Sequence, residues 1–455
     1  MAITNQIASY IVSTQFNDIP QTTVETAKRL LLDGIGCLLA GTIAEPGKIA
    51  SKMNAHLAGE AGQSTIIIDG RRCSPRAAAF VNGITLYSVG VNDIHKASGS
   101  HPGGCIIPAT LAVGEWQSIN GKDILTAMVA GYDVMGRLGR AMMPSHRECG
   151  FHPTGTFGTF ASTAAVGRLL QLDVKKMMSA FGIAGSQAAG LTSFQTDGSL
   201  TMIFHAGRAA QNGVESCLLA QEGFTGPHTV FEDQRGGFVQ STSKHYELDA
   251  LTNQLGTSFE IDETTFRPFY GCTYTIAASS ATAEILKRNS NKKIVHITQV
   301  IVRCHAIVID EVGNNNPQTL LAARISMEFN VALVMARGDV LVGDVTETDL
   351  WNPAIRSLFP LIKLQEDSSM SSWASVVTIH YKDGSTNTVE SLTPKGDPKN
   401  PMSWEDTENK FYQLIETINS KKQGSRIVEL VHNIENTNGS VLMKAINETA
   451  LSKIS

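Results

Sequence analysis

The sequence lacks the features that mark several large protein classes. Its seven cysteines are odd in number, scattered and without a CxxC pair, which predicts reduced thiols rather than a disulfide or zinc framework. No stretch reaches the roughly 18 apolar residues of a membrane-spanning helix. The first residues carry no positive charge, so no signal peptide is predicted. The net charge of −5 provides no basic surface for nucleic acid or an anionic membrane. We therefore expect a cytoplasmic protein that binds neither.

Motifs for several kinds of chemistry are absent as well. No GxGxxG follows a strand and no Walker A sequence occurs, so the sequence predicts no phosphate-binding loop. The GxSxG of serine hydrolases and the HExxH of zinc proteases are missing. Charged residues make up 17% of the chain and hydrophobic residues 42%, an ordinary composition for a globular enzyme. Any chemistry must therefore come from the polar segments of the chain.

The first half of the chain has the pattern of a helical domain. The length of 455 residues suggests two or three domains. Apolar residues recur at intervals of three and four, which predicts amphipathic helices. The segment 156–220 is rich in Ala, Gly and Ser and predicts three helices that pack closely because their side chains are small. The other helices are expected at about 24–38, 75–90, 105–118 and 122–142.

The sequence changes character after residue 225. β-branched residues at 293–309 predict a strand, a helix is expected after Pro317, and two strand-like runs flank Lys382-Asp383-Gly384 as in a hairpin. We predict a mainly α protein in which a large all-helical domain carries an inserted, smaller α+β lid domain. The expected ranges are 1–265 for the first part of the helical domain, 266–393 for the lid, and 394–455 for C-terminal helices that return to the helical domain.

Three polar segments interrupt the helical half, and loops of this kind usually carry function. The segment 91–104 lies between two apolar runs and is rich in Gly and Ser. The segment 145–155 repeats its composition, and the third is the loop 192–201. Their candidate side chains are Asp93, His95, Lys96 and His101, then Arg147 and His152, and then Gln195.

Asp93, His101 and His152 form a candidate acid–base set. A carboxylate beside an imidazole raises its pKa and fixes its tautomer, so one imidazole can act as a base and another as an acid. A metal site at Asp93, His95 and His101 is an alternative, although these residues lie on a Gly/Ser loop without helical spacing. For any single histidine, a hydrogen-bonded core or cap position is the simplest interpretation. Three polar segments in one domain favour a shared cleft.

Four basic residues are candidates for binding substrate carboxylates, because a guanidinium can hold a carboxylate with two hydrogen bonds. Solvation at the surface is the simplest alternative for any one of them. They are Arg72, Lys96, Arg147 and Arg267.

A series of short motifs, in this order, resembles the MmgE/PrpD family over nearly the whole chain. That family includes 2-methylcitrate dehydratase, cis-aconitate decarboxylase and iminodisuccinate epimerase. The resemblance implies a helical domain with an inserted α+β lid, a catalytic cleft between them, a homodimer and no cofactor. It also places Asp93, His101 and His152 at family active-site positions. The motifs are Leu32-Asp-Gly-Ile-Gly36, Asn92-Asp93 with His101-Pro-Gly-Gly104, Gly150-Phe-His-Pro-Thr-Gly-Thr-Phe-Gly158, Gly185-Ser-Gln-Ala-Ala-Gly-Leu191, His205-Ala-Gly-Arg-Ala-Ala-Gln-Asn-Gly213 and Pro394-Lys-Gly-Asp-Pro-Lys-Asn-Pro-Met402.

Three positions depart from the pattern that the resemblance implies. Met202 stands where decarboxylase-like members have a lysine, Ile276 where a lid segment ends in a histidine, and Phe329 where a lid helix supplies a tyrosine. Methionine and isoleucine neither transfer protons nor bind carboxylates. We therefore expect a substrate that carries less charge than methylcitrate or cis-aconitate. Arg267 and Tyr274 lie near the altered lid segment and are candidates to compensate.

The sequence thus predicts a cofactor-independent lyase or isomerase that removes a proton next to a carboxylate on a small carboxylic acid. Dehydratase, decarboxylase and epimerase all stay open. An epimerase needs only two opposed acid–base groups, so it tolerates the missing lysine best. An alternative of another class is a catalytically silent binding or scaffold protein. The changes at 202, 276 and 329 favour that alternative, and the retained Asp93, His101 and His152 oppose it.

Overall fold

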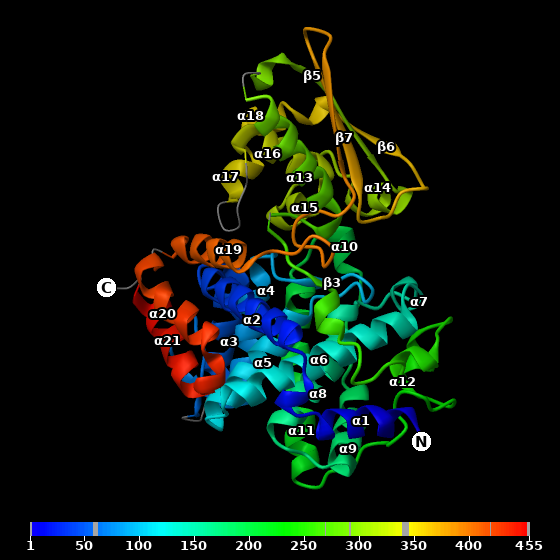
Figure 1. Ribbon diagram of the computed structural model, residues 1–455, viewed down its shortest axis with the longest axis vertical. Coiled ribbons are helices and arrows are strands. Elements are labelled where there is room, and N and C mark those ends of the chain that lie inside the picture. Colours follow the sequence, from blue (N-terminus) through cyan, green and yellow to red (C-terminus); the bar gives the residue numbers. More distant parts are fainter. Residues whose placement is uncertain are drawn as a thin grey trace. The chain divides into compact units, whose positions relative to one another are not determined.

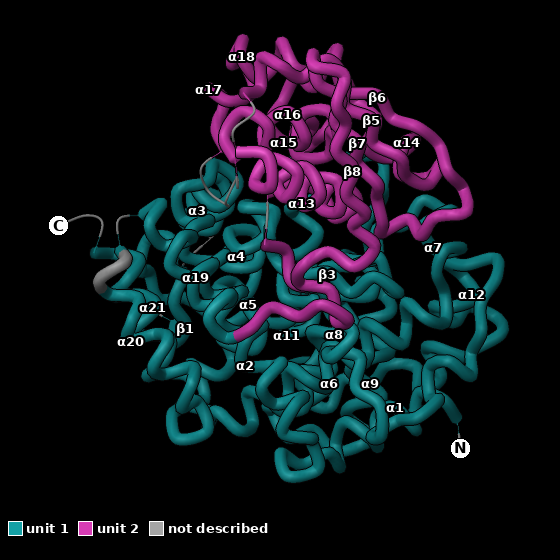
Figure 2. The backbone as a smooth tube through the Cα atoms, turned by 45° about the horizontal axis from the view of Figure 1, so that its top comes forward, with its two compact units in different colours: residues 1–196, 200–265, 404–455 teal, residues 197–199, 266–403 magenta. Residues whose placement is uncertain are grey.

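The computed structural model describes residues 2–57, 62–268, 270–290, 293–338, 345–418 and 420–452. The chain forms two compact units (Figure 2). Unit 1 comprises residues 1–196, 200–265 and 404–455, and unit 2 comprises residues 197–199 and 266–403. The described residues are mainly helical, as predicted. Residues 394–403, which we expected with the C-terminal helices, are grouped with unit 2, where the N–H of Phe266 donates to the carbonyl of Gly396 (2.9 Å).

Unit 1 consists mostly of helices packed on one another (Figure 1). Two short antiparallel strand pairs correct the expectation of an all-helical domain: β1 (Ser64–Thr65) with β2 (Arg72–Cys73), and β3 (Ile94–His95) with β4 (Thr264–Thr265). The short helix α10 (Phe194–Asp197) starts in unit 1. The helices of unit 1 are α1 (Ile3–Ser13), α2 (Gln21–Gly41), α3 (Glu45–Leu57), α4 (Pro75–Ser88), α5 (Pro102–Trp116), α6 (Gly121–Met142), α7 (Ser145–Glu148), α8 (Pro153–Leu169), α9 (Val174–Gly185), α11 (Thr201–Gln221), α12 (Phe238–Thr242), α19 (Trp404–Glu416), α20 (Lys421–His432) and α21 (Gly439–Leu451).

The C-terminal helices lie against the N-terminal ones, and α19 runs beside α2 (Figure 1). The Lys410 ammonium on α19 lies 2.5 Å from the Asp33 carboxylate on α2, and both side chains are buried. Lys410 also donates to the carbonyl of Val91 (2.8 Å), the first residue of the first polar segment. Since a buried charge needs a partner, this ion pair ties the end of the chain to its beginning.

Glycines let the central helices of unit 1 approach closely. A Cβ on Gly83 of α4 would lie 2.8 Å from the Cα of Gly207 on α11. A Cβ on Gly155 of α8 would lie 2.5 Å from the carbonyl oxygen of Ala189 and 3.2 Å from the Cβ of His205. Any larger residue would force backbones apart, so these positions require glycine.

Unit 2 combines a four-stranded sheet with helices. The strand order is β6-β5-β7-β8, in which β5 pairs parallel with β6 and antiparallel with β7. The β7–β8 hairpin turns at the predicted Lys382-Asp383-Gly384. The strands are β5 (Ile297–Cys304), β6 (Ile362–Glu366), β7 (Ser375–Tyr381) and β8 (Thr386–Ser391); the helices are α13 (Thr273–Arg288), α14 (Ala306–Val312), α15 (Leu320–Arg324), α16 (Met327–Arg337), α17 (Glu347–Leu350) and α18 (Pro353–Arg356).

The strand predicted to reach Ile309 ends five residues earlier. His305 accepts a hydrogen bond from the backbone N–H of Ile307 (3.1 Å) and caps α14. Val308 and Val312, four residues apart, then turn into the core of unit 2. A side-chain cap and helical burial therefore override the β propensity of this segment.

Among the described residues, no single helix is both long and apolar enough to cross a membrane. By length and composition only, the bent pair Gln21–Gly41 and Glu45–His56 passes that test when the two helices are taken together.

Candidate active site

His101 and His152 precede two neighbouring helices in the same way. Each is the N-cap residue, and each is followed by proline at the first helical position, where a missing N–H costs nothing. The helices α5 and α8 pack directly on each other. The backbone N–H of His101 donates to the hydroxyl of Thr154 in the first turn of α8 (3.3 Å). The fold thus brings together two histidines, His101 and His152, that lie far apart in the chain.

Asp93 holds the start of α5. Its carboxylate accepts hydrogen bonds from the backbone N–H of Gly103 (3.1 and 3.0 Å) and from the hydroxyl of Tyr132 (2.8 Å). Its side chain is buried, and a Cβ at Gly103 would lie 2.6 Å from the carboxylate. A carboxylate at a helix N-terminus is stabilised by the helix dipole. Asp93 is therefore an anchor for the helix that carries His101.

The backbone of Asp93 also orients the imidazole of His101. The Nδ1 atom of His101 lies 2.7 Å from the carbonyl oxygen of Asp93. Because a carbonyl only accepts, Nδ1 carries the proton, and in neutral His101 the lone pair lies on Nε2. The ring of Tyr87 contacts this imidazole edge-on, with centroids 5.3 Å apart. The carbonyl of Asp93 thus orients this imidazole, and the role predicted for the Asp93 carboxylate toward His101 stays a prediction.

His205 is a histidine that the candidate set did not include. Its Nδ1 lies 2.9 Å from Nδ1 of His152, and both imidazoles are buried. One of these two nitrogens must carry a proton and donate the hydrogen bond, and the other must accept that hydrogen bond. The sequence did contain a signal for His205, because it is the first residue of one of the family-like motifs. A histidine inside a predicted helix, however, is simplest to interpret as a core residue. Close packing of α11 on α8 brings it to His152.

The environment keeps the imidazoles of His152 and His205 neutral near pH 7. Burial lowers the pKa of His205 to about 4. Burial is also the main cause that lowers the pKa of His152 well below its usual range, and the nearby basic side chains of His205, His101 and Arg147 act in the same direction. Neutral imidazoles can accept protons. An anionic substrate beside them would raise these pKa values again.

His95 belongs to a separate, buried network. Its Nε2 lies 3.1 Å from the carboxylate of Glu260, which also accepts from Nε of Arg140 (2.7 and 2.9 Å). Burial alone would raise the pKa of Glu260, but the hydrogen bonds from His95 and Arg140 lower it to about 2. Within the described ranges, His, Cys, Asp and Glu side chains form no group of three that could hold a metal ion. The metal set that we considered at Asp93, His95 and His101 is therefore not assembled.

The remaining predicted site residues of unit 1 differ in burial and in their distance from the histidines. Arg147 is half-buried and lies close enough to affect the pKa of His152, as described above. Lys96 is half-buried in the turn that Gly99 closes. Gln195 is exposed on α10, and Met202 is buried in the first turn of α11. Arg72 is not brought together with the histidines, because it pairs with Glu115 at the opposite end of α5.

Four predicted residues belong to unit 2. Phe329 is fully buried in its hydrophobic core, so core packing accounts for this residue without a substrate. Ile276 on α13 is 2% exposed. The ring of Tyr274 stacks on Trp373 with centroids 4.7 Å apart, and the guanidinium of Arg267 donates to the carbonyl of Gly271 (3.2 Å). Roles of these residues toward a substrate stay predictions.

Comparison with known proteins gives the family. Residues 5–250 match the MmgE/PrpD N-terminal domain and residues 269–436 match the MmgE/PrpD C-terminal domain. The chain therefore belongs to the MmgE/PrpD family. It is similar to a cis-aconitate decarboxylase-like protein of Aspergillus oryzae, with 27% identity over 95% of this chain and 94% of the relative. It is 27% identical to human cis-aconitate decarboxylase (95% and 92%) and 26% identical to that of Aspergillus terreus (98% and 96%).

Proposed function

We propose that the protein is a cofactor-independent lyase or isomerase that removes a proton next to a carboxylate of a small carboxylic acid. The observation that carries the proposal is that His101 and His152 lie at the starts of two packed helices and His205 pairs with His152, in an environment that keeps His152 and His205 neutral. The names of the relatives, cis-aconitate decarboxylases, support a lyase acting on such an acid.

His101 is the candidate base. The carbonyl of Asp93 fixes its proton on Nδ1, so Nε2 accepts the proton from the substrate. His152, paired with His205, is the candidate proton donor to the leaving group or to the opposite face. The N-termini of α5 and α8 carry partial positive charge, which favours a substrate carboxylate close to them. In the complex that negative charge raises the imidazole pKa and lets His152 hold a proton.

The proposed substrate differs from cis-aconitate and methylcitrate. Met202, which stands at a lysine position of decarboxylase-like members, is buried in the first turn of α11, three residues before His205. Without that positive charge, a tricarboxylate loses one of its ion pairs. A smaller or less charged acid is the better match, and the two histidines alone suffice for epimerisation.

The test is a panel of small carboxylic acids incubated with the full chain in D2O and followed by proton NMR. Loss of CO2 or water identifies a lyase, and deuterium uptake without elimination identifies an epimerase. His152→Ala should abolish the activity, whereas His56→Ala, an exposed histidine on α3, should leave it unchanged. Thermal stabilisation by an acid without any turnover or exchange would contradict the proposal and favour a binding or scaffold protein.

A further inference from the structure

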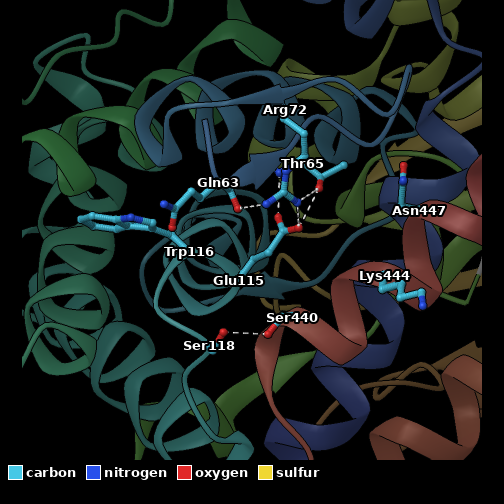
Figure 3. A pocket seen from close by; sticks show the side chains of 9 residues that line it. All are labelled: Gln63, Thr65, Arg72, Glu115, Trp116, Ser118, Ser440, Lys444 and Asn447. Carbon is cyan, nitrogen blue, oxygen red and sulfur yellow. Dashed lines mark hydrogen bonds and ion pairs between the residues drawn. The ribbon is translucent and has the colours of Figure 1, made fainter. Parts of the chain in front are cut away.

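A pocket lies at the C-terminal end of α5. Its volume is about 440 Å³, which is within the range of small-molecule sites. Side chains from 63–118 and from α21 surround it (Figure 3). His101 precedes the other end of the helix, about 20 Å away along its axis. The lining residues are Gln63, Thr65, Arg72, Glu115, Trp116, Ser118, Ser440, Lys444 and Asn447.

The carboxylate of Glu115 in this pocket already accepts three hydrogen bonds. Thr65 and Arg72 face each other across the β1–β2 pair. One oxygen of the buried Glu115 carboxylate accepts from the N–H of Thr65 (2.7 Å), and the other accepts from its hydroxyl (2.7 Å) and from the Arg72 guanidinium. Figure 3 shows these contacts on one side of the pocket. Glu115 therefore fixes Arg72 in place and has little capacity left for a ligand.

The groups that still face the pocket are mainly donors. Arg72 uses Nη1 for Glu115 and Thr65 and one Nη2 proton for the carbonyl of Gln63, and its side chain is 49% exposed. Lys444 is 77% exposed and only loosely paired with Glu448 at 3.9 Å. Oδ1 of Asn447 is buried and is therefore not among the groups that a ligand in the open pocket can reach.

We propose that this pocket binds a small anion that carries a carboxylate or phosphate group. Lys444 and the outer edge of Arg72 would hold the anionic group. Trp116 takes no part, because its indole points away from the Arg72–Glu115 pair in Figure 3. The site is separate from the histidine cluster and does not depend on its chemistry.

Binding at this pocket rests heavily on Lys444. The Glu115 charge and the negative end of the α5 dipole both oppose an anion, and Arg72 is half neutralised by its partner. Lys444 supplies the excess positive charge. Reversing its charge should therefore weaken binding by at least about tenfold, and increasing salt should weaken it further.

The experiment is calorimetric titration of the full chain with citrate and, separately, with inorganic phosphate at low ionic strength. The variant is Lys444→Glu, and the matched control is Lys52→Glu, an exposed lysine in the middle of α3. We expect at least one probe to bind, with affinity reduced at least tenfold in K444E and unchanged in K52E. Binding of citrate only, or of phosphate only, identifies which oxyanion the pocket selects.

Three outcomes would overturn the proposal. They are the absence of binding by either probe, equal losses in both variants, and binding that K444E leaves intact. The last result would place the anion at another site, such as the histidine cluster.

Discussion

The buried imidazole of His146 should make unit 1 sensitive to acid. The side chain is fully buried against three phenylalanine rings. Its Nδ1 lies 3.1 Å from the carbonyl of Thr242, and its Nε2 lies 2.8 Å from the hydroxyl of Thr156 in the first turn of α8. Nδ1 therefore carries the proton and Nε2 accepts from the hydroxyl. Burial lowers the pKa of His146 to about 4.

The size of the effect follows from the difference in pKa between the two states. An unfolded chain takes up this proton near pH 6.5, whereas folded His146 takes it up only near pH 4. Between these values the unfolded state binds more protons, so the free energy of unfolding falls as the pH decreases. Going from pH 7 to pH 5 should remove about 2 kcal/mol through this group alone. The full loss, reached below pH 4, is about 3 kcal/mol.

Replacing His146 with glutamine removes the titrating group and keeps a side chain that donates and accepts hydrogen bonds. Urea unfolding at pH 7 and pH 5 gives the pH-dependent loss for each protein. This loss should be about 2 kcal/mol smaller in H146Q than in the unsubstituted chain. The exposed His56 provides the control, and H56Q should keep the original loss. Equal losses in the unsubstituted chain and H146Q would refute the reasoning, because His146 would then titrate alike in both states.

Three further outcomes are expected. Gly207→Ala should lower stability by about 1–3 kcal/mol in urea unfolding, because the new methyl group meets α4 backbone, whereas Gly236→Ala, which meets nothing within 4 Å, should be nearly neutral. Lys410→Met should cost about 3–5 kcal/mol by the same measurement, since it leaves Asp33 buried and charged, and adding Asp33→Asn should recover part of that loss. His205→Gln should lower turnover about tenfold to a hundredfold and shift the pH–rate profile; an unchanged profile would reduce His205 to a packing role.

Helices with clear apolar periodicity could be predicted from the sequence. The segment 122–142 became α6 with almost the same bounds, because most of its length is buried and periodicity reports burial. The hairpin around Lys382-Asp383-Gly384 was visible for a similar reason, since its turn residues have a local cause. The strand–helix change at Cys304 was not visible, because a cap at His305 outweighed β-branched composition.

The candidate site could be predicted only in part. The Gly- and Pro-rich surroundings of His101 and His152 marked them as more than core residues, and the fold brings both to adjacent helix starts. His205 was missed because its role depends on which helix face meets α8. Arg72 was a reasonable anion ligand by residue type. Residue type does not show, however, that Arg72 pairs with Glu115 at the C-terminal end of α5, away from the histidines. Phe329 shows the same limit, since a family position can be filled by a core residue.

Glycines on α8 and α11 determine which residues can be exchanged around the pair of His152 and His205. Gly155 of α8 lies against the Cβ of His205, and Gly213 of α11 lies against the backbone of Ser162 on α8, so glycines set the separation of the two helices. The main chain therefore fixes how closely the backbones that carry His152 and His205 approach, and their Nδ1 atoms lie 2.9 Å apart. Neighbouring positions such as Met202 can then be exchanged without moving the proton-sharing atoms. Side chains around the proposed acid–base centre can therefore change while the two histidines keep their positions.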